Sequence, residues 1–542
     1  MFRLFKLWFN PFTILALVLF PLLVQGGAIK INQPFADLGN VSFVVGFAPW
    51  NRVIYIADPL GDGVRHLYSV NTTGQGLKDL SGDLVAGGSV RGAKISPDLQ
   101  RVVFMADKDN DEVFELYSVS VSGGKVIKIS GNMAFGGDII AATETGDGYY
   151  TISPNSQWVV FLADKDIDTV RELYLAPIAG GVVQKVNAPL ELGERIPFNI
   201  GSEPTFTWDS HFLVYMAVLQ TGAELFRYDI FTKKNIKLNS PLVPGGGIYS
   251  FEVSQNVEVP RVVYSGDQDV FDLEELFSVS IYGGEITKLN GPVKPKFKPT
   301  EIVSFHISPD GNRVVYMSEH LDDTDIEVYS TLIAGGELVR LSDGNNNSVG
   351  DMKNFVITPD GQRVIMLGPD TKETFTELFS ARIQGGGSVK LNQPEDFQGN
   401  IGLPNISPNS ERTLYRVTIG GGDQKRSRLY SVPTTGGGRV ALTPDFVVGK
   451  NVVDYEITDD SKKVVIYGDL ITQDQFELYS APIEGGDLSK LSPALAANQD
   501  VAHPTQGMSK TVRIHPNSKS VVFTAGGPFL QSKIELYLAP IP

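Results

Sequence analysis

The chain has 542 residues and is acidic, with 62 Asp and Glu against 46 Lys and Arg and a formal net charge of −16. We therefore expect no nucleic-acid partner, because phosphate binding requires concentrated positive charge. The sequence has no cysteine, which excludes disulfides and thiolate chemistry.

Residues 1–26 have the layout of a secretory signal peptide. Arg3 and Lys6 precede an apolar stretch over residues 12–24, and the small-residue sequence Val24-Gln25-Gly26 follows it. The apolar stretch is shorter than the roughly 20 residues that span a bilayer, and no later stretch approaches that length. We expect a periplasmic or extracellular (secreted) protein with no transmembrane segment after signal removal. Retention of the signal as an N-terminal anchor is the alternative.

Residues 27–542 repeat one sequence pattern. In one copy it runs Ile95-Ser96-Pro97-Asp98, Val102-Val103-Phe104, Glu115-Leu116-Tyr117, Gly123-Gly124 and Ile127-Lys128-Ile129. The aromatic residue of the third element marks ten copies, spaced by 49 to 58 residues: Tyr68, Tyr117, Tyr174, Phe226, Phe277, Tyr329, Phe379, Tyr430, Tyr479 and Tyr537. The repeats fill the chain and leave no room for a separate catalytic domain.

Each repeat predicts a four-stranded antiparallel sheet. The β-branched and aromatic runs are typical of strands, and Pro-Asp-Gly or Pro-Asn-Ser favours a tight turn between the first two. Gly-Gly supplies positive φ between the third and fourth strands. Such a sheet cannot bury both faces alone, and stacking in a ring solves this. The predicted fold class is all-β, a β-propeller of about ten four-stranded blades, with two smaller rings as the alternative.

The two ends of the chain complement each other. The last repeat ends on its third strand, Glu535-Leu536-Tyr537-Leu538, without a fourth. Residues 28–34 closely match residues 388–394, which hold the fourth-strand position of an internal repeat. We expect the N-terminal strand to join the last blade and close the ring, which removes the exposed sheet edges of an open arc.

The repeated Ile-Ser-Pro-Asp/Asn, Val-Val-Phe/Tyr, Glu-Leu-Tyr/Phe and Gly-Gly elements resemble the TolB-like (WD40-like) propeller repeats of bacterial periplasmic and secreted proteins. The resemblance covers essentially the whole chain after the signal. It implies a β-propeller, and it leaves the function open because propellers host many unrelated activities. The chain has more repeats than TolB and lacks its additional N-terminal domain.

Enzymes with similar blades give the alternative reading. Such blades precede serine-peptidase domains of the prolyl oligopeptidase type, but the sequence contains neither an α/β-hydrolase domain nor a Gly-x-Ser-x-Gly motif. Propellers similar to oligogalacturonate lyase use histidines near the ring axis. The six histidines here fall in different repeats, without the i, i+4 spacing of a helical zinc site: His66, His211, His306, His320, His503 and His515.

Two hairpins between the second and third strands carry alternate aspartates. They contain Asp107, Asp109 and Asp111, and Asp164, Asp166 and Asp168, with looser versions at Asp267, Asp269 and Asp272 and at Asp322, Asp323 and Asp325. Alternate carboxylates in a tight loop can direct several hard oxygens to one point, as calcium requires. These six aspartates are the candidate calcium ligands. The competing interpretation is an ordinary solvated turn whose charges discourage edge pairing.

The geometry of an antiparallel repeat separates two kinds of connection. The hairpins between second and third strands emerge on the same side as the long, variable connections between repeats, and the tight turns emerge on the other side. Binding residues concentrate on loops held by a rigid scaffold. We therefore predict a non-enzymatic exported scaffold that binds a protein or polysaccharide partner on its loop-rich face. The alternatives are a hydrolase or lyase with its site at the central channel mouth, and a cell-envelope structural protein.

Overall fold

The computed structural model consists of antiparallel β-sheets joined by turns and loops. It describes residues 27–36, 38–141, 148–197, 201–255, 257–291, 302–319, 325–342, 351–369, 376–393, 399–496, 499–501, 511–527 and 533–542. The predicted signal peptide, His320, Asp322, Asp323 and His503 lie outside these residues. Within the described part of the chain, no helix combines the length and hydrophobicity needed to cross a membrane.

Seven sheets have four strands each, hydrogen-bonded in the order of the sequence. The first four sheets along the chain comprise β6 (Val90–Ile95), β7 (Arg101–Ala106), β8 (Glu115–Ser120) and β9 (Ile127–Lys128); β10 (Tyr150–Ile152), β11 (Trp158–Ala163), β12 (Glu172–Pro177) and β13 (Gln184–Lys185); β14 (Thr205–Phe206), β15 (Phe212–Leu219), β16 (Gly222–Asp229) and β17 (Asn235–Lys237); and β18 (Ile248–Val253), β19 (Arg261–Gly266), β20 (Glu275–Ser280) and β21 (Ile286–Lys288). The other three comprise β22 (Ile302–Ile307), β23 (Arg313–Glu319), β24 (Ile326–Leu332) and β25 (Val339–Arg340); β26 (Asn354–Ile357), β27 (Arg363–Pro369), β28 (Thr376–Arg382) and β29 (Ser388–Lys390); and β35 (Val452–Ile457), β36 (Lys463–Gly468), β37 (Glu477–Pro482) and β38 (Ser489–Lys490).

An eighth sheet has five strands, because two short strands share the place of the first. Its strands are β30 (Asn400–Ile401), β31 (Asn405–Ile406), β32 (Arg412–Ile419), β33 (Arg426–Pro433) and β34 (Val440–Ala441), with the 3-10 helix η3 (Gly422–Gln424) between β32 and β33. Both β30 and β31 pair with β32.

The remaining strands form a nine-stranded sheet from the two ends of the chain. It comprises β2 (Asn40–Ala48), β3 (Arg52–Asp58), β4 (His66–Asn71) and β5 (Lys78–Asp79), together with β39 (Asp500–Val501), β40 (Val512–Ile514), β41 (Ser520–Gly526), β42 (Ile534–Pro540) and β1 (Ile29–Lys30). The two groups meet at one parallel bridge between Asn40 and Ile534. The N-terminal strand β1 pairs antiparallel with β42, with Ile29 opposite Leu538.

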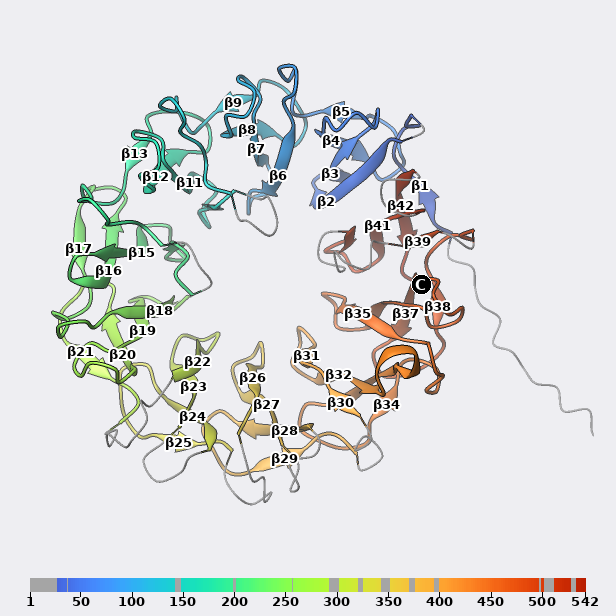
Figure 1. Ribbon diagram of the computed structural model, residues 1–542. Coiled ribbons are helices and arrows are strands. Elements are labelled where there is room, and N and C mark those ends of the chain that lie inside the picture. Colours follow the sequence, from blue (N-terminus) through green and yellow to red (C-terminus); the bar gives the residue numbers. More distant parts are fainter. Residues whose placement is uncertain are drawn as a thin grey trace, which may run out of the picture.

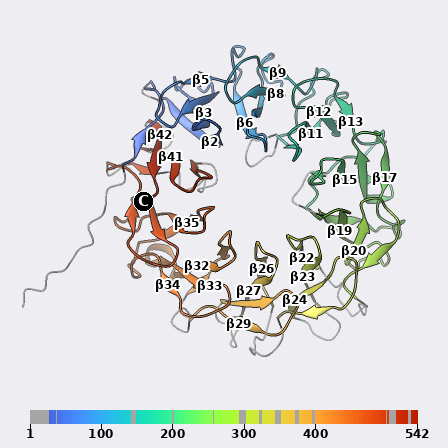
Figure 2. The same ribbon diagram turned by 180° about the vertical axis from the view of Figure 1, so that it is seen from behind.

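Figure 1 shows the sheets following one another around a ring, with β2, β6 and β26 toward the middle and β5, β17 and β29 toward the outside. The view from behind shows β42 and β2 side by side again (Figure 2). The prediction of an all-β chain built from many four-stranded antiparallel sheets is confirmed.

The hydrophobic cores lie between neighbouring sheets. One cluster contains Val103 and Met105 of β7 together with Val159 and Phe161 of β11. Facing side chains from two sheets thus bury each other, and each sheet supplies apolar residues from both of its faces.

An ion pair joins the third and fourth strands in most sheets. Glu115 is buried, and its carboxylate lies 2.6 Å from Lys128 Nζ and accepts a hydrogen bond from the Tyr117 hydroxyl. The repeated Glu-Leu-Tyr element is therefore a structural unit, in which the lysine of the fourth strand neutralises a carboxylate that would otherwise be unpaired. Equivalent pairs form between Lys185 and Glu172, Lys237 and Glu224, Lys288 and Glu275, Arg340 and Glu327, Lys390 and Glu377, Lys490 and Glu477, and Lys30 and Glu535.

In the β2–β5 group the charges of this pair are exchanged. His66 takes the third-strand position of Glu115, and Asp79 takes the fourth-strand position of Lys128, with 2.8 Å between His66 Nδ1 and the Asp79 carboxylate. The hydrogen bond to Asp79 raises the pKa of His66. The charge of this ion pair therefore depends on the protonation of a histidine, whereas the equivalent pairs named above contain lysine or arginine.

A polar residue after each fourth strand also binds the third strand. Asn187 Oδ1 accepts a hydrogen bond from the Leu173 backbone N–H at 2.7 Å. Asn32, which follows β1, accepts the equivalent bond from the Leu536 N–H at 2.8 Å, although the two residues are 504 positions apart. The N-terminal segment thus makes the same contact on β42 that internal fourth strands make within their own sheets.

We predict that Asn32→Ala lowers the free energy of unfolding by about 1–3 kcal/mol, because the buried Leu536 N–H loses its acceptor. Urea unfolding of the full chain measures this loss. The control is Gln33→Ala, which removes an exposed bond to the Gly74 carbonyl and is expected to change stability by less than about 0.5 kcal/mol. Equal losses in the two variants would show that Asn32 has no special role.

The His66 and Asp79 pair predicts a pH-dependent contribution to stability. Because the folded-state pKa of His66 is raised, this contribution is complete below the unfolded-state pKa of about 6.5 and is lost as the pH rises through the folded-state value. The double variant His66→Glu, Asp79→Lys places the charges as in the other sheets. Its thermal unfolding midpoint should fall less than the wild-type midpoint above about pH 6.5, because the contribution of the His66 and Asp79 pair is removed. Parallel pH profiles would contradict this assignment.

Candidate partner-binding face

The hairpins between second and third strands lie against the connections that lead into the same sheets. The Ala134 N–H donates to the Lys165 carbonyl at 2.7 Å, and the Val85 N–H donates to the Lys108 carbonyl at 3.0 Å. These bonds bring hairpin and connection to one side of the sheets. We call this side the loop-rich face.

The first aspartate of a hairpin holds these two segments together. Asp164 is buried, and its two carboxylate oxygens accept backbone hydrogen bonds from Asp138 in the connection (2.6 Å) and from Thr169 in the hairpin (3.0 Å). Thr169 has a φ of 69°, so the carboxylate also stabilises a left-handed residue. The same arrangement occurs at Asp107, Asp267 and Asp469.

The other two predicted calcium ligands of this hairpin point to different neighbours. Asp166 forms ion pairs with Lys185 (3.0 Å) and Lys165 (3.3 Å). Asp168 lies over Gly136, where a Cβ atom would be 2.9 Å from its carboxylate. Gly136 also has a φ of 80°, so both the backbone conformation and the close contact with Asp168 require glycine at this position.

The hairpin at Asp107 is arranged in the same way. Asp109 forms an ion pair with Lys128 at 2.9 Å, and Asp111 lies over Gly87. Among the residues that the structure describes, no group of three or more His, Cys, Asp or Glu side chains is placed to hold a metal ion. The calcium site therefore stays a prediction, and the aspartates have structural contacts that do not depend on it.

Exposed apolar side chains project from the braced connections. Phe135 is fully exposed, although its neighbours Ala134 and Gly136 both contact the hairpin between β11 and β12. Ile167, at the tip of that hairpin, is 62% exposed. Phe135 and Ile167 form what we call the Phe135 patch, and Asp166 and Asp168 flank it. Apolar side chains on rigid backbone are the groups that typically dominate binding at an interface.

The next connection presents a second apolar side chain in the same way. Leu192 is fully exposed, and its carbonyl accepts a hydrogen bond from the Gln220 side chain of the hairpin between β15 and β16 at 2.9 Å. The sequence predicted a partner-binding face at these connections without singling out Phe135 or Leu192. The signal that this prediction missed is an apolar residue set between turn residues, as in Ala134-Phe135-Gly136-Gly137.

The structure does not gather the described histidines at one point. His66 pairs with Asp79, His211 stacks on Phe212 and His515 packs against Phe47. His306 forms an ion pair with Glu252, with 2.7 Å between Nδ1 and the carboxylate, and it brings the first strands β22 and β18 together. The hydrogen bond to Glu252 raises the pKa of His306.

No protein-family model matches the sequence, and no curated protein matches it. A eukaryotic initiation factor has a similar structure, with 12% identity and a TM-score of 0.49 over 79% of this chain and 94% of that one. An oligogalacturonate lyase in complex with manganese is 13% identical, with a TM-score of 0.35 over 72% of this chain and 88% of that one. A TolB-type protein of Agrobacterium tumefaciens is 14% identical, with a TM-score of 0.26 over 58% and 96%. The likeness to the lyase and to the TolB-type protein, both β-propellers, concerns the fold alone and assigns no activity or partner.

We predict that Asp164→Ala destabilises the protein by about 2–3 kcal/mol, because two backbone N–H groups lose a charged acceptor. Hydrogen exchange should locate the loss at the Asp138 and Thr169 amides. The matched control, Asp166→Ala in the same hairpin, removes an exposed ion pair and should change stability by less than about 1 kcal/mol. An unchanged exchange pattern in the Asp164 variant would contradict the bracing role.

Proposed function

We propose that this protein is a non-enzymatic exported scaffold that binds a protein or polysaccharide partner on its loop-rich face. The observation that carries the proposal is the Phe135 patch, an exposed aromatic ring on a connection that is hydrogen-bonded to a neighbouring hairpin. Because the backbone under the ring is already ordered, binding would lose little conformational entropy there.

The flanking charges indicate the chemistry of such a partner. Asp166 and Asp168 border the Phe135 patch, and Glu191 and Glu194 lie beside Leu192. An apolar surface with carboxylates at its edge favours a protein that presents apolar and basic groups together. A polysaccharide would instead use the ring of Phe135 as a stacking surface.

The proposal includes a single closed ring of ten blades. Its support is the pairing of β1 with β42 and the hydrogen bond from the Leu536 N–H to Asn32, which give the last group of strands a fourth member. It also includes export directed by residues 1–26 and calcium binding at the aspartates of the two hairpins, both of which rest on the sequence.

A second candidate is a hydrolase or lyase with its site near the middle of the ring. The observation that favours it is the ion pair of His306 with Glu252, since a histidine and a carboxylate in contact are a common acid–base combination. Among the described residues, this pair is not part of a group of three or more His, Cys, Asp or Glu side chains that could hold a metal ion.

Capture on the immobilised chain tests the scaffold function. We expect proteins or glycans from the source organism's envelope and medium to bind, and the double variant Phe135→Ser, Leu192→Ser to lose them. The matched control is Phe231→Ser, Tyr282→Ser, which removes two exposed aromatic residues from the tight-turn side. Mass spectrometry and glycan analysis identify the retained molecules.

Running the capture with calcium and with chelator separates the two parts of the proposal. Elution by chelator supports calcium in the hairpins, and retention in chelator removes calcium from the proposal without affecting the scaffold. Retention that the Phe135 variant leaves intact overturns the assigned surface. If nothing is retained, the scaffold function fails, and a substrate screen with His306→Gln as the inactive control tests the enzyme. Self-association as the sole interaction would favour a structural protein of the envelope.

A further inference from the structure

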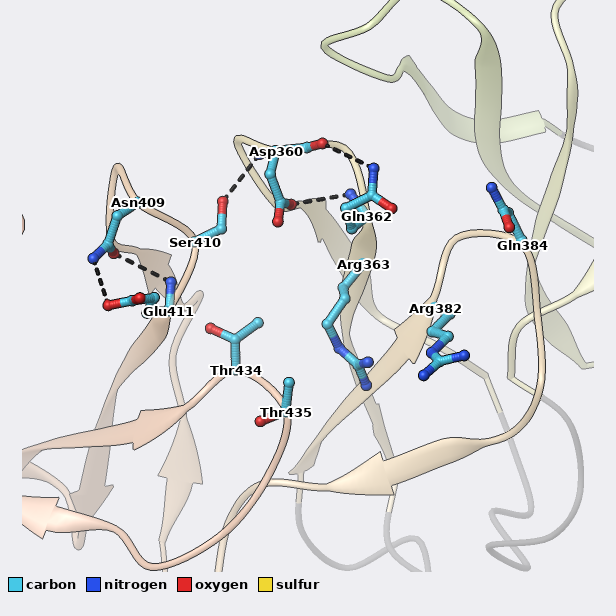
Figure 3. A pocket seen from close by; sticks show the side chains of 10 residues that line it. All are labelled: Asp360, Gln362, Arg363, Arg382, Gln384, Asn409, Ser410, Glu411, Thr434 and Thr435. Carbon is cyan, nitrogen blue, oxygen red and sulfur yellow. Dashed lines mark hydrogen bonds between the residues drawn. The ribbon is translucent and has the colours of Figure 1, made fainter.

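A polar groove of about 610 Å³ lies between the β26–β29 sheet and the β30–β34 sheet. It opens on the tight-turn side, opposite the loop-rich face, because its lining comes from the tight turns of both sheets (Figure 3). The lining residues are Asp360, Gln362, Arg363, Arg382, Gln384, Asn409, Ser410, Glu411, Thr434 and Thr435. The groove contains charged groups, amides and hydroxyls, and no aromatic residue.

Two arginines face each other across neighbouring strands in this groove. Arg363 begins β27 and Arg382 ends β28, and the antiparallel register places them directly opposite. Like charges in that position repel each other. The pKa of Arg363 is lowered, first by burial and then by the charge of Arg382.

The arginines differ in how they are held. Arg363 Nε donates to the Ser380 hydroxyl at 2.8 Å, and Nη2 donates to the Ser380 carbonyl at 3.2 Å. These bonds fix the guanidinium and leave Nη1 free among the described residues. Arg382 is exposed and makes no hydrogen bond or ion pair with any residue that the structure describes.

The carboxylates of the groove offset this charge only from a distance: the charge of Asp360 opposes the lowering of the pKa of Arg363 by Arg382. Asp360 accepts hydrogen bonds from the Thr358 hydroxyl and the Gln362 N–H, and Glu411 accepts one from the Asn409 side chain. Neither forms an ion pair with Arg363 or Arg382 within the described part of the chain. The lining is therefore formally neutral, but within it the two guanidinium groups lie opposite each other and form no ion pair with any residue that the structure describes.

The other repeats show that the second arginine is not needed for the fold. Five other sheets also begin their second strand with an arginine, and there the residue directly opposite on the third strand is uncharged. Asn71 faces Arg52, Ser120 faces Arg101, Ser280 faces Arg261, Leu332 faces Arg313 and Pro433 faces Arg412. In the described strands, an arginine faces an arginine in the β26–β29 sheet alone.

We propose that this groove binds a small, hydroxyl-rich molecule through an oxyanion group, which Arg363 and Arg382 bind together. A carboxylate, phosphate or sulfate would offset the repulsion between the two guanidinium groups, and guanidinium N–H groups match the geometry of oxyanions. The volume exceeds that of a bare ion and is typical of small-molecule sites. Gln362, Gln384 and Thr435 offer amides and a hydroxyl to the rest of the ligand. The site is independent of the partner-binding face.

Isothermal titration calorimetry of the full chain at low salt tests the groove with four probes: glucuronate, glucose 6-phosphate, inorganic phosphate and glucose. We expect one of the two charged sugars to bind, and glucose to show no binding. Binding of glucuronate alone identifies a carboxylate ligand, and binding of glucose 6-phosphate alone identifies a phosphate ligand. Arg382→Gln should weaken the binding about tenfold or more, because a charge-assisted contact is lost.

The matched control is Lys462→Gln, which removes one exposed positive charge from the tight turn of the β35–β38 sheet and should leave binding unchanged. Four results would overturn the proposal. These are no binding of either charged sugar, equal binding of glucose, equal weakening in the control, and phosphate binding as tightly as its sugar ester. Arg382→Gln should also raise the thermal unfolding midpoint of the unliganded protein, because the substitution removes the repulsion between the two guanidinium groups. A lower midpoint would contradict this repulsion.

Discussion

Each sheet of this protein has two apolar faces, and both must be removed from water. In the part of the chain that the structure describes, ten clusters of buried residues meet this constraint, and each combines side chains from neighbouring groups of strands. The strands from the two ends of the chain share one of them, where Tyr55 of β3 packs with Val522 of β41 and Leu536 of β42. Since each sheet packs against neighbouring groups of strands, its second and third strands keep a length of six to eight residues, and this explains why the sequence repeats.

Burial between sheets also decides which polar residues can occur there. Ser118 is fully buried, and Arg101 Nε donates to its hydroxyl at 2.7 Å. Burial lowers the pKa of Arg101. The same bond recurs from Arg261, Arg313, Arg363 and Arg412 to Ser278, Ser330, Ser380 and Ser431. Arg363 is therefore present for a structural reason, and the proposed anion site required only that Arg382 be added opposite it.

The sequence predicts the strands and turns well because both follow from local residue types. The β-branched runs became the second and third strands, and Pro-Asp-Gly and Gly-Gly became tight turns. Contacts between repeats cannot be predicted in this way, because they depend on which residues the stacking of the sheets brings together. Pro154-Asn155-Ser156 reads as a turn, yet Ser156 also accepts a hydrogen bond from the Asp98 N–H of the preceding sheet, at 2.9 Å.

The candidate sites were harder to predict for the same reason. Alternate aspartates suggested ligands that converge, but Asp164 and Asp166 bind the segments on either side of them, and those segments come from distant parts of the repeat. Arg382 looks like an ordinary surface residue until the register of β27 and β28 places it opposite Arg363. A comparison of each repeat position across the chain could have found both Arg382 and Phe135, because each departs from its equivalents.

The two faces of the ring can evolve separately because the cores connect neighbouring sheets only. The connection that carries Phe135 is fixed by the β10–β13 sheet, whereas the arginine groove is fixed by the β26–β29 and β30–β34 sheets. Among the described residues, no core cluster contains side chains of both regions. A substitution in one region is therefore transmitted to the other only through several intervening interfaces, and distant sites without shared contacts combine additively. The repeated scaffold can thus carry two unrelated ligands on opposite sides without a conflict between their requirements.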